Sequence, residues 1–321
     1  MIKTLSYKTN QFFFVLIKLS IIAFAFYYIY NRLTHNADLN FSVFVNFLIE
    51  NDVFLLKNVI FLLFLTVFNW FFEIMKWKAL VSSIKNITFK KALEQSLGSL
   101  TASLFTPNRI GEYGAKAMYF SSVYKKRIVL LNLLGNIAQM SITLLLGVIG
   151  LIYFTSYNTV EINYFKLSSF VLIALLLLSL IPIGLKKLPI TIKGVSIEKI
   201  ILFIKNVSPR IHTYSFGFSL VRYFIFSFQF YYLLLLFGVN IFYLDAMAVI
   251  TSMYLLASII PSIFIFDVVI KGGIAVYLFS LIGVNEFTVL SVVTLMWLMN
   301  FVLPSIFGSL YVLNFNLPDE D

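Results

Sequence analysis

Long runs of apolar residues, separated by short polar segments, make up almost the whole chain. A helix needs about 20 apolar residues to cross a bilayer, and six runs come close to or exceed that length. The pattern therefore predicts an all-α polytopic membrane protein that forms one integral membrane domain over residues 1–321. The six predicted transmembrane helices are residues 12–30, 53–80, 128–154, 167–185, 214–237 and 287–313.

Two further apolar segments, 92–126 and 245–283, are each interrupted by a polar centre. The arms on either side of each centre have about 14–18 residues, which is short for a full crossing. We therefore predict a re-entrant helical hairpin at each segment. The alternative is that both segments cross the membrane as well.

The order span, span, hairpin, span occurs in both halves of the chain, 12–154 and 167–313. Because three crossings per half reverse the direction of entry, the second half is expected to be an inverted copy of the first. Inverted repeats with broken helices at the middle of the membrane are typical of secondary transporters. The alternative is that the similarity of the two polar centres arose by chance.

Basic residues mark one side of this predicted arrangement. Lys3 and Lys8 precede the first span, and Lys125–Arg127 stand at the end of the first hairpin segment. Because cytoplasmic loops carry an excess of Lys and Arg, we predict that both termini are cytoplasmic. Residues 186–210 form a basic connector in which an interfacial helix is expected, with a plain connecting elbow as the alternative.

Composition narrows the class further. The chain is 60% hydrophobic and only 12% charged, with a mean hydropathy of +0.95, whereas soluble domains carry about 25% charge. The net charge of +10 lies mainly in loops, so we predict no nucleic-acid partner. The absence of cysteine excludes thiolate metal sites and cysteine nucleophiles, and with two histidines we expect neither a metal nor a cofactor.

The first polar centre places three charges at helical spacing. Arg109 and Glu112 are three residues apart and Glu112 and Lys116 are four apart, so one helical face would carry all three. Glu112 neutralises one cation and leaves the other available for a phosphate or another anion. The alternative is an ion network that only holds the hairpin together.

Glycine and proline residues set the expected geometry of this hairpin. Pro107 is suited to a helix start, where its missing N–H costs nothing, and Gly111 and Gly114 would allow close backbone approach.

The second polar centre has a similar arrangement. Asp267 and Lys271 are four apart, Pro261 precedes them and Gly272 and Gly273 follow. A structural salt bridge is the alternative to a ligand or proton role for this pair.

Several polar residues interrupt the predicted spans themselves. Glu73 is expected to pair with Arg109 or Lys116, or else with Lys76 or Trp77 near the interface. Arg222, seven residues from Gln229 and on the same face, is expected to extend towards the cytoplasmic side. Lys18, in the first span, is expected to extend to the interface or to face a neighbouring helix. The third span carries a polar stripe that is expected to link helices or else to line a pathway, formed by Asn132, Asn136, Gln139 and Ser141.

The segment Leu104–Ala117 resembles the hallmark of the lysylphosphatidylglycerol synthase transmembrane-region family, a flippase-like domain. Asn69–Trp77 and Pro261–Gly272 are also similar to that family, although Asp267 and Lys271 stand where its members often carry Glu and Arg. The resemblance covers nearly the whole chain. It implies a stand-alone member without the aminoacyl-transferase domain, active in lipid translocation or as a partner in envelope lipid or glycolipid metabolism.

We therefore expect a transporter of an anionic lipid, either a phospholipid or a polyprenyl-phosphate-linked lipid, in the bacterial inner membrane. The predicted headgroup ligands are Arg109, Lys116 and Lys271, and the predicted charge-tuning or proton-coupling residues are Glu112, Asp267 and Glu73. No catalytic signature is apparent, so we do not expect an enzyme. The alternatives are a non-transporting scaffold in envelope lipid or glycan metabolism and, less favoured, an integral-membrane lipid-modifying enzyme. Beyond anionic lipids, a second copy of the chain or an envelope-biosynthesis enzyme is the expected partner.

Overall fold

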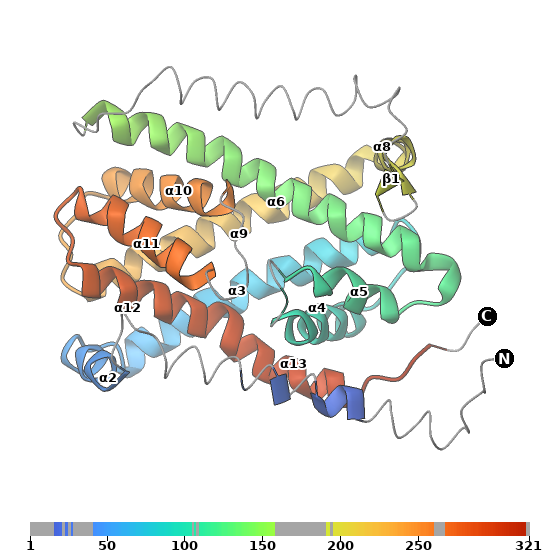
Figure 1. Cartoon of the computed structure of the whole chain (residues 1–321), viewed down its shortest axis with the longest axis horizontal. Helices are drawn as coiled ribbons and strands as arrows, with labels where there is room; N and C mark the ends of the chain where they lie inside the picture. The colour runs from blue at the N-terminus through green and yellow to red at the C-terminus, as the bar shows by residue number, and fades with distance from the viewer. Residues whose placement is uncertain are drawn as a thin grey trace.

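A computed structural model gives the arrangement of most of the chain (Figure 1). The structure describes residues 16–20, 23–24, 27, 41–104, 106, 109–157, 191–192, 195–259 and 267–318. The predicted span 167–185 lies outside these residues, and the predicted span 12–30 lies largely outside them. The described residues are mainly helical, apart from two short strands, β1 (Thr191–Ile192) and β2 (Val195–Ser196), that pair antiparallel.

Within the described residues, four helices are long and apolar enough to cross a membrane, which identifies a helical membrane protein. They lie along the longest axis of the molecule in Figure 1. Four of the six predicted spans are confirmed as such helices. They are α3 (Leu56–Val81), α6 (Ser122–Tyr157), α9 (Pro209–Leu236) and a composite of α12 (Glu286–Trp297), the π-helical turn η2 (Leu298–Val302) and α13 (Leu303–Leu313).

Shorter helices fill the space between the long ones. Each predicted hairpin segment contains two helices, α4 and α5 in the first and α10 and α11 in the second. A break separates α4 from α5, while residues 260–266, between α10 and α11, lie outside the described residues. A helix, α8, is present where an interfacial helix was predicted. The residues between the first two predicted spans include a helix, α2, whose buried Phe44 and Leu48 join the core. The shorter helices are α2 (Phe41–Glu50), α4 (Phe89–Ser103), α5 (Gly111–Met118), α8 (Ile197–Asn206), α10 (Tyr243–Ile259) and α11 (Asp267–Ser280).

Each half of the chain packs one of its short helices against a long helix of the other half. The central contact joins α3 to α9, while α4 packs against α13 and α10 packs against α6. In each of the contacts α4–α13 and α10–α6, a glycine of the long helix faces a threonine of the short helix. A Cβ added at Gly308 would overlap Thr101, and one added at Gly150 would overlap Thr251. Small residues at these positions let the helices approach closely, as is usual between membrane helices.

Charge is unevenly distributed between the two ends of the bundle. The end where α3 finishes and α6 and α9 begin carries the exposed basic residues Lys85, Lys90, Lys91, Lys125, Lys126, Arg127, Lys199, Lys205 and Arg210. The opposite end carries the exposed residues Glu50, Asp52, Lys57, Asp245 and Glu286. One end of the described structure is therefore strongly basic and the other is mainly acidic.

Candidate functional site

The three charges of the first polar centre meet as their spacing predicted. Arg109 Nη2 lies 2.7 Å from Glu112 Oε2, and Lys116 Nζ lies 2.6 Å from Glu112 Oε1. One carboxylate therefore bridges two cations on the first turns of α5. The Arg109 side chain keeps 32% of its surface exposed, whereas Lys116 keeps 2%.

The backbone at the start of α5 is specialised. Arg109 has φ +55°, in the left-handed region that non-glycine residues seldom adopt. Two residues later, the Gly111 amide donates to Thr106 Oγ1 at 3.0 Å, and a Cβ at Gly111 would lie 2.9 Å from Thr106 Cγ2. The predicted need for glycine at Gly111 is thus explained by this tight turn.

Lys116 is held from three sides. Besides Glu112, its ammonium donates to Asn132 Oδ1 at 2.8 Å and lies 4.3 Å from the ring centre of Trp77. Trp77 in turn donates to Gln95 Oε1 at 2.8 Å. These contacts compensate for burying a charge among α3, α5 and α6.

A second set of charges lies between α3 and α9. Glu73 accepts from Lys76 at 2.7 Å and pairs closely with Arg222. Arg222 also donates to Gln139 Oε1 at 3.3 Å and to Asn69 Oδ1 at 3.1 Å. The predicted pairing of Glu73 with Lys76 is confirmed. The other expectation, a direct ion pair of Glu73 with Arg109 or Lys116, is wrong for the described residues. The extension of Arg222 towards the cytoplasmic side stays a prediction, and its described counter-charge is Glu73.

These two sets form one cationic cluster, which we define as Glu73, Lys76, Arg109, Glu112, Lys116 and Arg222. Lys116 is close enough to Glu73 to interact with it electrostatically, which links the sets. Four cations meet two carboxylates, so two positive charges are not neutralised within the cluster. Two buried donors at its edge, Arg109 Nε and Asn132 Nδ2, have no hydrogen-bond partner among the described residues.

Asn300, which was not predicted as a site residue, lies in η2 and connects several helices. Its Oδ1 accepts from Asn69 Nδ2 at 2.8 Å, and its Nδ2 donates to Gln229 Oε1 at 2.9 Å. Its backbone carbonyl accepts from Trp70 Nε1 at 3.0 Å. An amide in the middle of an apolar span was the available signal, and π-helical turns often occur at functional sites.

The cluster and the Asn300 contacts are continuous. Asn69 accepts from Arg222 and donates to Asn300, so it joins the ion pairs to the amide contacts. Phe301, the residue after Asn300, lies with its ring centre 5.6 Å from the Arg109 guanidinium. The π-helical turn therefore contacts both ends of the charged region.

Some predicted site residues have other surroundings. A Cβ at Gly114 or Gly273 would meet no described atom within 4 Å, so the prediction that Gly114 allows close approach is wrong. A Cβ at Gly272 would make only an ordinary contact with Leu290, at 3.5 Å. Pro107, Pro261 and the side chains of Asp267 and Lys271 lie outside the described residues.

Polar residues of the predicted stripe on α6 bind neighbouring helices. Asn132 binds Lys116, Gln139 binds Arg222, and Asn136 Nδ2 donates to Tyr113 Oη at 2.7 Å. Ser141 instead donates to the carbonyl of Ile137 in its own helix. The stripe thus mainly orients the charged residues.

In the described part of the chain, no group of three or more His, Cys, Asp or Glu side chains is placed to hold a metal ion. Comparison with known protein families, with curated proteins and with solved structures finds no match to this chain. The family resemblance of the Leu104–Ala117 segment therefore stays a prediction.

Proposed function

We propose that this protein is a flippase-like transporter that moves an anionic lipid across the bacterial inner membrane. The observation that carries the proposal is the excess of two positive charges in the cationic cluster, in a helical membrane protein. Charge at membrane depth is costly and usually functional. An incoming phosphate would supply the missing counter-charge.

The donors of the cluster suit a phosphate. Arg109 is the most exposed cation of the four, and its Nε has no partner within the described structure. A guanidinium binds phosphate through two parallel hydrogen bonds, which gives orientation as well as energy. Asn132 offers a second donor next to Lys116. In this proposal Arg109 contacts the headgroup directly and Lys116 contributes mainly its charge.

The carboxylates set how strongly the headgroup binds. Glu112 and Glu73 each bridge two cations, so each lowers the positive potential without cancelling it. A transporter must also release its cargo, and partial neutralisation keeps binding weak enough for release. Lys271 and Asp267, both in α11, are proposed to add a ligand and a charge-tuning or proton-carrying group from the second half.

We also propose an inverted repeat. Its support is the helix order long, short, short, long in α3–α6 and again in α9–α13, with α4 and α10 each packed on the last long helix of the other half. The pairs α4–α5 and α10–α11 are proposed as re-entrant hairpins. The strongly basic end of the bundle would face the cytoplasm.

A lipid translocation assay tests the proposed function. Purified protein is placed in vesicles that contain a fluorescent phosphatidylglycerol, and dithionite quenching measures how fast the label moves between leaflets. We expect wild type to accelerate movement and Arg109→Ala to remove most of the acceleration. Lys85→Ala, which removes an exposed charge at the basic end, is the matched control and should behave as wild type.

The outcomes separate the candidate functions. Equal rates for protein-free vesicles and wild type, with stable capture of an envelope enzyme, would favour the scaffold instead. Formation of a new lipid product by the protein alone in detergent would favour a lipid-modifying enzyme. Wild-type rates in Arg109→Ala would reject the cationic cluster as the headgroup site.

A further inference from the structure

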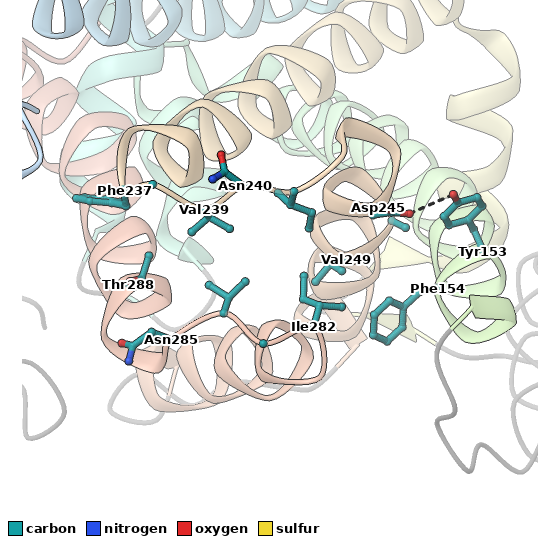
Figure 2. A pocket seen from close by; sticks show the side chains of 15 residues that line it. Tyr153, Phe154, Phe237, Val239, Asn240, Asp245, Val249, Ile282, Asn285 and Thr288 are labelled. Atoms are coloured by element: carbon teal, nitrogen blue, oxygen red, sulfur yellow. Dashed lines mark hydrogen bonds between the residues drawn. The ribbon is translucent and has the colours of Figure 1, made fainter.

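Figure 2 shows a pocket, which has a volume of about 750 Å³. It lies at the mainly acidic end of the bundle, away from the cationic cluster. Its walls are the loop after α9, the first turns of α10, the loop between α11 and α12, and the last turns of α6. The volume is in the range of ligand-binding sites, about 300–1,000 Å³. The fold therefore leaves a space of ligand size where four helix ends meet.

The pocket and the cluster are well separated. Gln139, which touches the cluster, and Phe154, which lines the pocket, are both on α6 and 15 positions apart. At the rise of an α-helix this is about 22 Å, most of the thickness of a membrane core. A small group bound in the pocket would therefore not contact the cationic cluster at the same time.

The chemistry of the lining is polar but has no described cation. Asp245 accepts from the Tyr153 hydroxyl at 3.2 Å, as drawn in Figure 2, and it is the one charged residue among the described lining residues. Asn240, Asn285 and Thr288 add side chains that donate and accept. Asn285 Oδ1 is already used to cap α12, where it accepts from the Phe287 amide at 2.9 Å, which leaves its NH₂ group for a ligand.

Aromatic residues complete the lining. The rings of Phe154 and Phe237 lie at opposite sides of the pocket in Figure 2, with Tyr153 beside Asp245. Flat apolar rings beside amides and a carboxylate suit a group that has both C–H faces and hydroxyls. An anion would be repelled by Asp245. An ammonium group would find one carboxylate that is exposed and already bonded to Tyr153.

We infer that this pocket binds an uncharged, hydroxyl-rich group, a glycosyl or glycerol unit, with Asp245 and the amides of Asn240 and Asn285 as hydrogen-bonding partners. A lipid headgroup and a free sugar carry the same hydroxyl chemistry, and the experiment below separates these two sources. The inference does not depend on lipid transport, since no residue of the cationic cluster lines the pocket.

Saturation-transfer NMR tests the inference directly. The protein is placed in phosphatidylcholine nanodiscs, and transfer of magnetisation to methyl β-glucoside is recorded. Wild type should give a signal, and Asp245→Ala should weaken apparent affinity about five-fold or more through a lost hydrogen bond. Ile241→Trp, which fills the space from a half-buried loop position, should remove the signal.

Controls separate this site from the cluster and from the membrane. Glu286→Gln removes a nearby acidic charge that is not in the described lining, and Arg109→Ala removes a charge of the cluster, so both should keep the signal. Displacement of the glucoside by glucosyl diacylglycerol in the disc would identify a lipid headgroup as the ligand. A glucoside signal that this lipid leaves unchanged would identify a free sugar. The inference is overturned if wild type gives no signal, if Ile241→Trp keeps it, or if tetramethylammonium displaces the glucoside.

Discussion

The guanidinium of Arg222 on α9 contacts the carboxylate of Glu73 on α3, 149 positions earlier in the chain. The same carboxylate also accepts from Lys76, whose side chain is 3% exposed. The contact with Arg222 joins α3 to α9, the first long helix of each half in the described structure, and these two helices pack closely together. Glu73 therefore neutralises two cations at the place where the halves meet.

Removing that carboxylate should destabilise the fold. Glu73→Gln leaves Lys76 and Arg222 without their counter-charge, and breaking a buried ion pair from one side costs about 3–5 kcal/mol. Reversible unfolding in mixed micelles measures the free energy. Glu198→Gln, an exposed acidic position on α8, should change it little.

A double-mutant cycle then isolates the ion pair. Glu73→Gln with Arg222→Gln should cost less than the sum of the single changes, because the second change removes one of the orphaned cations. Strictly additive effects would show that the two side chains do not interact in the folded protein.

Replacing Asn300 should lower the free energy of unfolding, although its side chain carries no charge. Asn300→Leu leaves two buried atoms, Asn69 Nδ2 and Gln229 Oε1, without the hydrogen bonds that Asn300 supplies, and each buried orphan costs about 1–3 kcal/mol. Loss of stability in the same unfolding assay is the expected result. Asn314→Leu, at an exposed position after α13, is the matched control, and an equal effect of both changes would argue against the network.

The local part of the candidate site could be predicted from the sequence. Residues three and four apart on a helix lie on one face, so the contacts of Glu112 with Arg109 and Lys116 follow from spacing alone. The contact of Arg222 with Glu73 could not be predicted, because spacing carries no information on which of several long helices lie together. Asn300 was missed for the same reason, since its partners lie on α3 and α9.

In the fold as well, local features could be predicted from the sequence and contacts between distant segments could not. Length and hydropathy were enough to predict the four long helices that the described residues contain, because a span is a local property. The packing of α4 on α13 and of α10 on α6 depends on Gly308 and Gly150. The sequence does not reveal their role, because the residues that they contact belong to the other half of the chain. Gly308 and Gly114 look equivalent in the sequence, yet a Cβ at Gly308 would overlap α4 and a Cβ at Gly114 would meet no described atom within 4 Å.

This contrast predicts how glycine substitutions behave. Gly308→Ala places a Cβ against the Leu97 carbonyl and Thr101, so α13 must move away from α4. Overpacking of this kind costs about 1–3 kcal/mol. Gly273→Ala meets no described atom and should be neutral or stabilise α11 by about 0.5–1 kcal/mol. The order of the two melting temperatures in detergent checks this, and a reversed order would contradict the described packing.

Arg109 combines a left-handed backbone with a side chain that is proposed to bind the headgroup, and two substitutions separate these properties. Arg109→Gly adopts the φ of +55° without steric strain, whereas Arg109→Val places a β-branched residue in that strained region. The valine variant should therefore be less stable than the glycine variant, by about 1–2 kcal/mol. Both variants lack the guanidinium, so both should lose lipid movement in the vesicle assay. Full transport by the stable glycine variant would mean that Arg109 is present for its turn and not for its charge, and the anion site would then have to lie elsewhere.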